Sequence, residues 1–224
     1  MRLIKREIKA ALLAVLIGIA MLLNSHGAKA GEQQELVVAG GCFWCVEADF
    51  ESVRGVSEAI SGYTGGTTEN PTYREVTRGG TGHYEAVRIL YDPAQVSREQ
   101  LLHMFFRSID PTDAGGQFCD RGESYRSAVF VANDAERRLA ETVKRRAEAE
   151  LGQAVVTPIL PEAEFYRAED EHQDYYKGTR IIITRFGPRR QADAYVAYRQ
   201  ACKRDARIFE LWGDDAPFVG KYLN

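Results

Sequence analysis

The chain has 224 residues, 45% of them hydrophobic, and a formal charge of −3 at neutral pH. This slightly acidic balance argues against a nucleic acid partner, because binding to a phosphate backbone requires a basic surface. The apolar content suffices for one sizeable core, and no internal repeat, low-complexity tract or long linker interrupts it. A single folded domain is therefore expected.

The first thirty residues have the features of an export signal. A basic start is followed by the apolar run "AALLAVLIGIAMLL", and "AKA" at 28–30 offers a small-residue cleavage site. The alternative is a membrane anchor, but the uncharged run 10–24 is shorter than the roughly 20 residues that a spanning helix needs. We expect a signal peptide over 1–30, a mature domain over 31–224 and a periplasmic or otherwise exported location. Loss of five basic residues and one acid would change the formal charge from −3 to −7.

The mature chain alternates predicted strands and helices. "ELVVAGG" predicts a strand that ends in a glycine turn, and the spacing of Phe43, Val46 and Phe50 predicts a helix over Cys42 to Val53. Further strands are predicted at "HYEAVRILYD", "YRSAVFVAND" and "AVVTPILP", and further helices at "SREQLLHMFFRSI", "DAERRLAETVKRRAEAEL" and the start of "QADAYVAYRQACKRDARIFELWG". Turns and long functional loops are predicted at "GYTGGTTENP", "DPTDAGGQFCDRGESYRS" and "HQDYY". The pattern predicts an α+β fold in which mixed strand pairing is possible.

The segment "GGCFWC" at 40–45 places two cysteines at the start of a predicted helix. A thiol reacts as a thiolate, and the unpaired N–H groups of a helix N-terminus lower its pKa, so Cys42 is the candidate nucleophile. Cys45 lies one helical turn further along the same face and could pair with it. The adjacent aromatics Phe43 and Trp44 point about 100° apart on a helix. One of them is therefore expected to line a pocket beside the sulfur.

A carboxyl in the next clear strand is the candidate proton donor. In "HYEAVRIL", alternation places Glu85 on one face and Arg88 on the other. If Arg88 marks the solvent side, Glu85 points inward, where desolvation raises its pKa and keeps it protonated. A glutamate exposed on an edge strand is the alternative, and this strand alone does not separate the two.

A C-x-x-C pair also occurs in zinc sites and in thioredoxin-like disulfide exchangers. A zinc module would add to Cys42 and Cys45 two ligands from Cys119, Cys202, His83 and His172. A second C-x-x-C or H-x-x-H pair at ordinary spacing is absent from the sequence, so no metal is expected. A thioredoxin-like exchanger would need a well-placed proline-containing strand after the helix, and the sequence offers none.

The order of several short motifs resembles the peptide methionine sulfoxide reductase A family, which restores methionine from its S-sulfoxide. The motifs are "GGCFWC", "GYTGG", "NPTYREV", "TGHYEAV", "YDP", "CDRGESYRS" and "AEDEHQDYY", over about Glu35 to Tyr176. The resemblance implies a peptide-methionine (S)-S-oxide reductase. It also implies one α+β domain in which helices cover a mixed sheet, as a two-layer sandwich of the ferredoxin-like plait type. The C-terminal arm would begin at about 187.

The resemblance further implies the residues that act on the sulfoxide. Cys42 would attack the sulfur and Glu85 would protonate the oxygen, with hydrogen bonds from Tyr73 and Tyr125. Elementary chemistry agrees with this allocation, because a sulfoxide oxygen leaves only after protonation. The site therefore needs a neutral acid together with a thiolate.

The remaining implications concern the pocket and the partners. Phe43 and Trp44 would hold the substrate S-methyl group, and Asp120 would lie at the pocket rim. Substrates would be oxidised proteins, oxidised peptides and free methionine S-sulfoxide. No cofactor is implied beyond a thioredoxin-like protein or another dithiol as reductant, and a monomer is expected.

The sequence departs from much of the family at the cysteines that would complete the reaction. A sulfenic acid on Cys42 must condense with another thiol before it oxidises further. Many relatives have glycine at the position of Cys45, asparagine at that of Cys119, and a glycine-rich tail with recycling cysteines. Here "YRQACKRDARIFELWG" supplies Cys202 instead. Cys202 on a mobile arm and Cys45 are equal candidates for the resolving thiol, ahead of Cys119, and two of them could pass a disulfide along.

Overall fold

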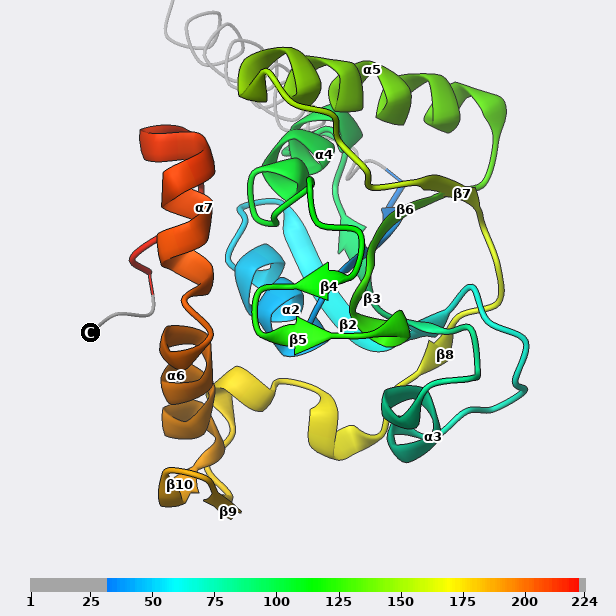
Figure 1. Ribbon diagram of the computed structural model, residues 1–224. Helices are drawn as coiled ribbons and strands as arrows, with labels where there is room; N and C mark the ends of the chain where they lie inside the picture. The colour runs from blue at the N-terminus through cyan, green and yellow to red at the C-terminus, as the bar shows by residue number, and fades with distance from the viewer. Residues whose placement is uncertain (1–31, 222–224) are drawn as a thin grey trace, which may run out of the picture. The chain divides into compact units, whose positions relative to one another are not determined.

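The computed structural model describes residues 32–221, so the predicted export signal lies outside the described residues. The strands are β1 (Gln34–Gly40), β2 (Val56–Thr64), β3 (Tyr84–Tyr91), β4 (Gly116–Gln117), β5 (Asp120–Arg121), β6 (Ser127–Val131), β7 (Ile159–Pro161), β8 (Tyr166–Arg167), β9 (Ile181–Thr184) and β10 (Gly187–Arg190). The helices are α2 (Phe43–Glu51), α3 (Tyr73–Arg78), α4 (Arg98–Phe106), α5 (Asp134–Leu151), α6 (Gln191–Ala201) and α7 (Arg204–Trp212) (Figure 1). Within the described residues, no helix combines the length and apolar character needed to cross a bilayer.

A mixed sheet organises the domain. Its strand order is β7-β6-β1-β3-β2-β8, with β6 and β7 parallel and the other neighbours antiparallel. Helix α2 connects β1 to β2, and α4 follows β3 on the way to β6. The inner order β6-β1-β3-β2 is therefore that of a ferredoxin-like plait, extended by one short strand at each edge. The predicted α+β class and mixed sheet are confirmed.

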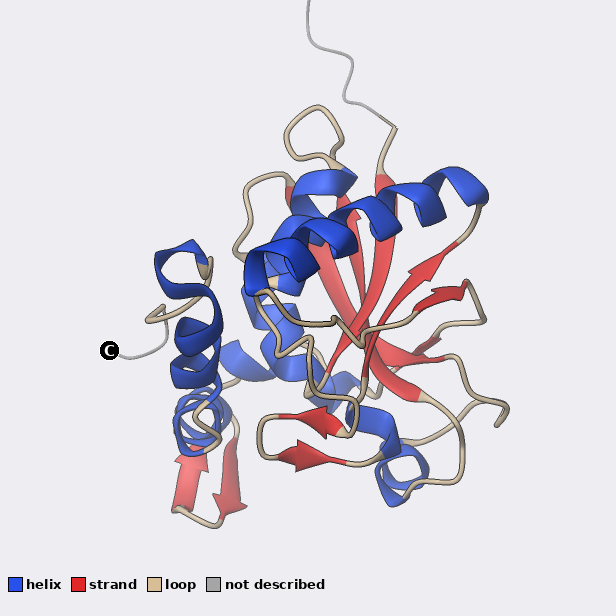
Figure 2. Ribbon diagram, turned by 45° about the horizontal axis from the view of Figure 1, so that its top comes forward, coloured by secondary structure: helices blue, strands red, loops and turns tan. Residues whose placement is uncertain are grey.

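The main core lies between the sheet and its helices. Val38, Val87 and Val129 face this core from β1, β3 and β6, and they are fully buried with Phe50 of α2 and Phe105 of α4. Strand alternation explains why every second residue contributes. Figure 2 shows the strands of the large sheet side by side, with the long helix α5 crossing in front of them.

Four sequence predictions of local structure need correction. Strand β2 enters the predicted turn region at Gly62, because pairing with β3 along its whole length overrides the turn-forming glycine. Helix α3 was missed, although Thr72 and Glu75 form a capping box at its start. The predicted loop over 110–127 contains the β4–β5 hairpin. The strand predicted at "AVVTPILP" contracts to β7, which is only three residues long.

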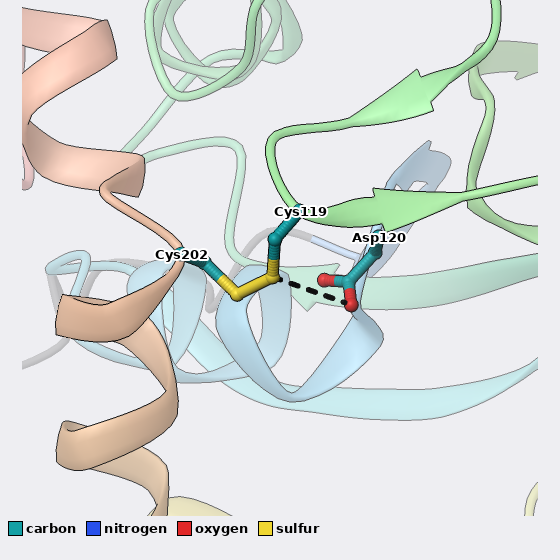
Figure 3. A group of neighbouring side chains, drawn as sticks. All are labelled: Cys119, Asp120 and Cys202. Atoms are coloured by element: carbon teal, nitrogen blue, oxygen red, sulfur yellow. Dashed lines mark hydrogen bonds between the residues drawn. A yellow bond between two sulfur atoms is a disulfide. The ribbon is translucent and has the colours of Figure 1, made fainter.

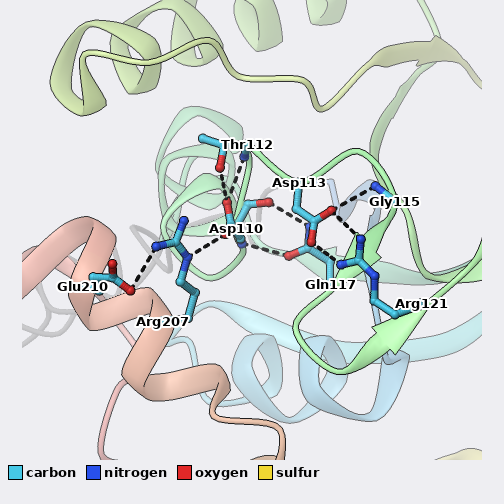
Figure 4. Close-up of polar contacts among 8 residues, drawn as sticks. All are labelled: Asp110, Thr112, Asp113, Gly115, Gln117, Arg121, Arg207 and Glu210. Atoms are coloured by element: carbon cyan, nitrogen blue, oxygen red, sulfur yellow. Dashed lines mark hydrogen bonds and ion pairs between the residues drawn. The ribbon is translucent and has the colours of Figure 1, made fainter.

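The C-terminal arm is packed against the domain. The Arg204 guanidinium is buried and donates hydrogen bonds to the carbonyls of Gly40 (3.3 Å) and Ser108 (2.7 Å). Arg207 Nε donates to Asp110 Oδ2 at 2.7 Å, beside the hydrogen bonds that join the Asp110 backbone to the Gln117 side chain (Figure 4). The arm thereby fixes the turn before Cys42 and the loop that leads into β4.

We expect Ser97→Ala to lower the free energy of unfolding by about 1 kcal/mol, because it removes the N-cap of α4. The Ser97 hydroxyl accepts from the Gln100 amide at 3.2 Å, and the Gln100 side chain accepts from the Ser97 amide at 2.9 Å. Urea unfolding measures the change. Ser97→Thr keeps the capping oxygen and should retain most of the stability; equal losses in both variants would contradict this role of the cap.

Candidate active site

The turn between β1 and α2 sets the position of Cys42. Gly41 has φ +80°, and a Cβ there would lie 2.5 Å from Gln117 Cβ, so only glycine fits. Cys42 follows as the N-cap of α2, and its carbonyl accepts the Cys45 amide at 3.0 Å. The helix therefore starts at the candidate nucleophile, as predicted.

Glu85 points inward from β3 and is only 1% exposed. Its Oε2 accepts the Phe43 amide at 3.1 Å, and its Oε1 has no hydrogen-bond partner among the described residues. Burial raises the pKa of Glu85 to about 8; the Phe43 hydrogen bond opposes this rise and the Asp120 charge adds to it. The predicted burial is confirmed, and the carboxyl is mainly protonated at neutral pH.

Cys42 and Cys45 are the two free cysteines, and each changes the pKa of the other. The hydrogen bond between their sulfurs raises the pKa of Cys42 well above its ordinary value and lowers that of Cys45 to about 7. The predicted lowering of the Cys42 pKa by the helix N-terminus is therefore wrong, because the neighbouring thiol and burial outweigh it. Burial raises the pKa of Cys42 further, and the positive charges of Arg204 and Arg199 help to lower that of Cys45. Cys45 is therefore the more acidic thiol of the two, and Cys42 keeps its proton at neutral pH.

All ten predicted site residues line one cavity of about 430 Å³. They come from the start of α2, from α3 and β3, from the loop around β5 and from the end of α6. They are Cys42, Phe43, Trp44, Cys45, Tyr73, Glu85, Cys119, Asp120, Tyr125 and Cys202. The fold therefore gathers residues that lie up to 160 positions apart in the sequence.

Aromatic rings form one wall of this cavity. Trp44 stacks on Tyr175 with ring centroids 3.7 Å apart, and Phe43 lies 6.1 Å from Tyr73. Behind them His172 packs 4.2 Å from the Tyr73 ring. Both Phe43 and Trp44 line the cavity, whereas the sequence required only one of them to do so. An apolar group such as an S-methyl fits such a wall.

Two tyrosine hydroxyls lie on the same cavity as Glu85. Burial and the negative charge of Glu85 raise the pKa of both Tyr73 and Tyr125, so both keep their protons at neutral pH. The exposed Glu169 accepts the Tyr73 amide at 2.8 Å and the Tyr63 hydroxyl at 2.8 Å, which fixes the start of α3. The cavity thus contains hydroxyl donors beside a neutral acid.

Cys119 and Cys202 form a disulfide at the cavity wall (Figure 3). Their Cα atoms are 4.9 Å apart although 83 positions separate them in sequence. Cys119 is exposed, and its sulfur lies 3.8 Å from Asp120 Oδ1. The bridge joins the end of α6 to the β4–β5 loop, so in this structure Cys202 is paired and Cys45 is the thiol in contact with Cys42.

Apart from Cys202, sequence reasoning missed the contribution of the C-terminal arm to the cavity. Arg199 is buried, bonds Asp49 at 2.9 Å and Asp205 at 2.8 Å, and lines the cavity. The other unpredicted lining residues are Phe118, Tyr175, Arg185, Tyr195, Tyr198 and Arg204. No motif distinguishes these arginines from the other basic residues of the tail, because only the folded arm brings them to the site.

Among the described residues, the ligands of the zinc site considered from the sequence do not come together. In the part of the chain that the structure describes, the potential metal-binding groups are Cys119–Asp120–Cys202 and Glu47–Glu51–Asp174. Cys42 and Cys45 belong to neither group. The sulfurs of Cys119 and Cys202 are joined in a disulfide, whereas zinc binds thiolates.

A thiol pair, a neutral carboxyl and an aromatic wall around one cavity define a thiol-dependent oxidoreductase. The family model described as "Peptide methionine sulfoxide reductase" matches residues 34–207. Peptide methionine sulfoxide reductase MsrA 2 of Rhizobium meliloti is 46% identical over 84% of this chain and 88% of its own length. The MsrA 2 of Caulobacter vibrioides is 47% identical over 91% of this chain and 95% of its own.

A solved structure agrees with these relatives. Methionine sulfoxide reductase A of Corynebacterium diphtheriae has a TM-score of 0.59 and 34% identity, and the match covers 67% of this chain and 76% of that chain. The chain therefore belongs to the peptide methionine sulfoxide reductase family, in the MsrA group. Its activity is that of a peptide-methionine (S)-S-oxide reductase, so the thioredoxin-like exchanger is set aside.

We expect kcat/KM for a methionine S-sulfoxide peptide to be bell-shaped with pH. It should rise through about pH 7, where the thiol pair loses its first proton, and fall through about pH 8, where Glu85 ionises. Steady-state rates across pH 5.5–9.5, a range chosen to span both steps at about 1.5 pH units on either side, test the profile.

We expect Glu85→Gln to lower kcat/KM by roughly 10²- to 10⁴-fold, because the amide cannot supply the proton. Glu58→Gln, which changes an exposed carboxyl on β2, is the matched control and should retain the activity. A Glu85→Gln variant with wild-type kcat/KM would exclude Glu85 as the acid.

Proposed function

We propose that Cys42 attacks the sulfoxide sulfur while Glu85 protonates the oxygen. The observation that carries this proposal is the Glu85 carboxyl, buried and neutral, bonded to the first amide of the helix that Cys42 begins. Tyr73 and Tyr125 donate hydrogen bonds to the same oxygen, and Phe43 and Trp44 hold the S-methyl group. Asp120 borders the cavity at its rim.

Cys45 takes the thiol proton of Cys42 in this step. As the Cys42 sulfur bonds the substrate sulfur, its proton moves to the Cys45 thiolate along the existing hydrogen bond. Glu85 gives its proton to the oxygen, and the oxygen passes to Cys42. The products are methionine, a sulfenic acid on Cys42, a neutral Cys45 thiol and an ionised Glu85.

Cys45 then resolves the sulfenic acid. Its sulfur bonds Cys42, and its proton leaves with the hydroxyl group as water, while Glu85 recovers a proton from solvent. Two features support Cys45 over Cys202: its contact with Cys42 and the existing disulfide between Cys202 and Cys119. The Cys119–Cys202 bridge serves to hold the arm on the cavity.

A thioredoxin-like dithiol protein returns two electrons and two protons to the Cys42–Cys45 disulfide. Cys42 is partly exposed at the cavity, which gives an external thiol a sulfur to attack. The oxidised proteins, peptides and free methionine S-sulfoxide are reduced by a monomer that needs no further cofactor.

The enzyme acts in the periplasm or another exported compartment after removal of residues 1–30. The basic start, apolar run and "AKA" site support this location, and the Cys119–Cys202 disulfide suits an oxidising compartment. N-terminal sequencing of protein from the periplasmic fraction should begin near Gly31. Full-length protein confined to the cytoplasm would exclude export.

A single-turnover experiment distinguishes the resolving cysteine. We expect the Cys119→Ser/Cys202→Ser double variant, reduced beforehand, to form about one methionine per chain and a Cys42–Cys45 disulfide. Cys42→Ser should form none, because the nucleophile is lost. Peptide mapping by mass spectrometry without added reductant measures both products.

Cys45→Ser provides the matched test of resolution. It should form methionine more slowly and leave a Cys42 sulfenic acid that dimedone traps. A Cys42–Cys202 disulfide in the reduced wild-type protein after one turnover would instead assign the resolving role to Cys202.

A further inference from the structure

The β9–β10 hairpin carries an unusual apolar surface. Ile183 pairs with Pro188 and Ile181 with Arg190, so these four residues share one face of the hairpin, here called the outer face. Ile181 is 70% and Ile183 82% exposed. A groove of about 500 Å³ lies between the hairpin and α6, and its lining includes Ile181, Pro188 and Arg190 of the outer face and Val196 of α6.

The opposite side of the hairpin belongs to the wall of the active site. Ile182 packs against the buried cluster that contains Cys45, Tyr175 and Tyr195. Arg185, in the turn between β9 and β10, lines the catalytic cavity and lies 5.2 Å from the Tyr198 ring. The hairpin is thus continuous from the cavity wall to the exposed outer face, and Figure 1 shows it beside the start of α6.

The hairpin is also basic on a chain whose formal charge is −3. Within residues 32–221, Arg185, Arg189 and Arg190 form no ion pair. Asp193 is the acidic residue that lines the adjacent groove. Arg190 lies on the outer face and Arg189 borders the groove, so the positive charge there favours a partner that carries acidic residues.

We propose that the outer face of the β9–β10 hairpin binds the polypeptide segment that carries the methionine sulfoxide, and prefers segments with apolar and acidic neighbours. The proposal rests on the proposed function. Oxidation makes a methionine side chain polar and disrupts the core around it, so the damaged segment exposes its apolar neighbours. Such a segment can lie along the exposed isoleucines while its sulfoxide enters the cavity beyond Arg185.

Kinetics with two substrates test this surface. We expect Ile181→Ser/Ile183→Ser to lower kcat/KM roughly 10-fold, mainly through KM, for a peptide with leucine and glutamate beside the sulfoxide. N-acetyl-methionine S-sulfoxide should show no change, because it does not reach the outer face. Dithiothreitol serves as the reductant in both assays, so that docking of a protein donor does not contribute.

Two further variants separate apolar from charge effects. Phe209→Ser removes a 52% exposed aromatic from α7, outside the hairpin, and should leave both substrates unaffected. Arg190→Glu should raise KM about 5-fold for the glutamate-containing peptide and by less for its glutamine analogue, with the difference shrinking at high salt.

The outcomes distinguish this proposal from the proposed function. Equal effects of the isoleucine variant on peptide and N-acetyl-methionine S-sulfoxide would overturn substrate docking, since the change would then act on the cavity itself. An effect seen only as a raised KM for a thioredoxin-like protein would also overturn it and assign the outer face to the reductant. If Cys42→Ser kept wild-type turnover of the small substrate, the proposed function would fail, whatever the hairpin does.

Discussion

The burial of one carboxyl against a helix N-terminus is the constraint on which the site depends. Glu85 is held in the core by the Phe43 amide, and this contact places the acid next to the residue that begins α2. Desolvation would be costly for a charged glutamate, so the group stays protonated instead. The same helix start presents Cys42. One local arrangement therefore supplies both groups of the proposed reaction, and the sheet that carries β1 and β3 fixes their separation.

The C-terminal arm supplies two buried arginines that hold the turn before Cys42 and helix α2 in place. Arg204 bonds the Gly40 carbonyl, directly before the glycine turn, and Arg199 binds Asp49 on the helix face that bears Cys45. A buried guanidinium group is costly unless it has hydrogen-bond or charge partners. The arm and the turn before Cys42 therefore stabilise each other. Their charges also help to keep Cys45 ionised near neutral pH. The Cys119–Cys202 bridge closes this contact covalently at the rim.

The four cysteines thus divide into two pairs with different chemistry. Cys42 and Cys45 are free thiols that line the cavity, and Cys45 is the more acidic of the two. Cys119 and Cys202 are joined at the surface of the same cavity and fix the position of the arm. The hairpin that precedes α6 extends this arm outward, so the substrate surface that we propose is continuous with it. A change in the arm should therefore affect both chemistry and substrate choice.

The sequence by itself determined the parts whose signals are local: the strand, glycine turn and helix around Cys42, the inward side of β3 at Glu85, and the capped helix α4. Motif order also identified the family. Strand β2 escaped sequence analysis because its end carries the turn-forming Gly62, and the β9–β10 hairpin because "GPRR" in β10 has no strand pattern; pairing with the neighbouring strand forms both. Only the tertiary structure paired Cys119 with Cys202 and brought Arg199 and Arg204 to the cavity. Those contacts join residues far apart in the chain, and no local periodicity encodes which distant side chains will meet.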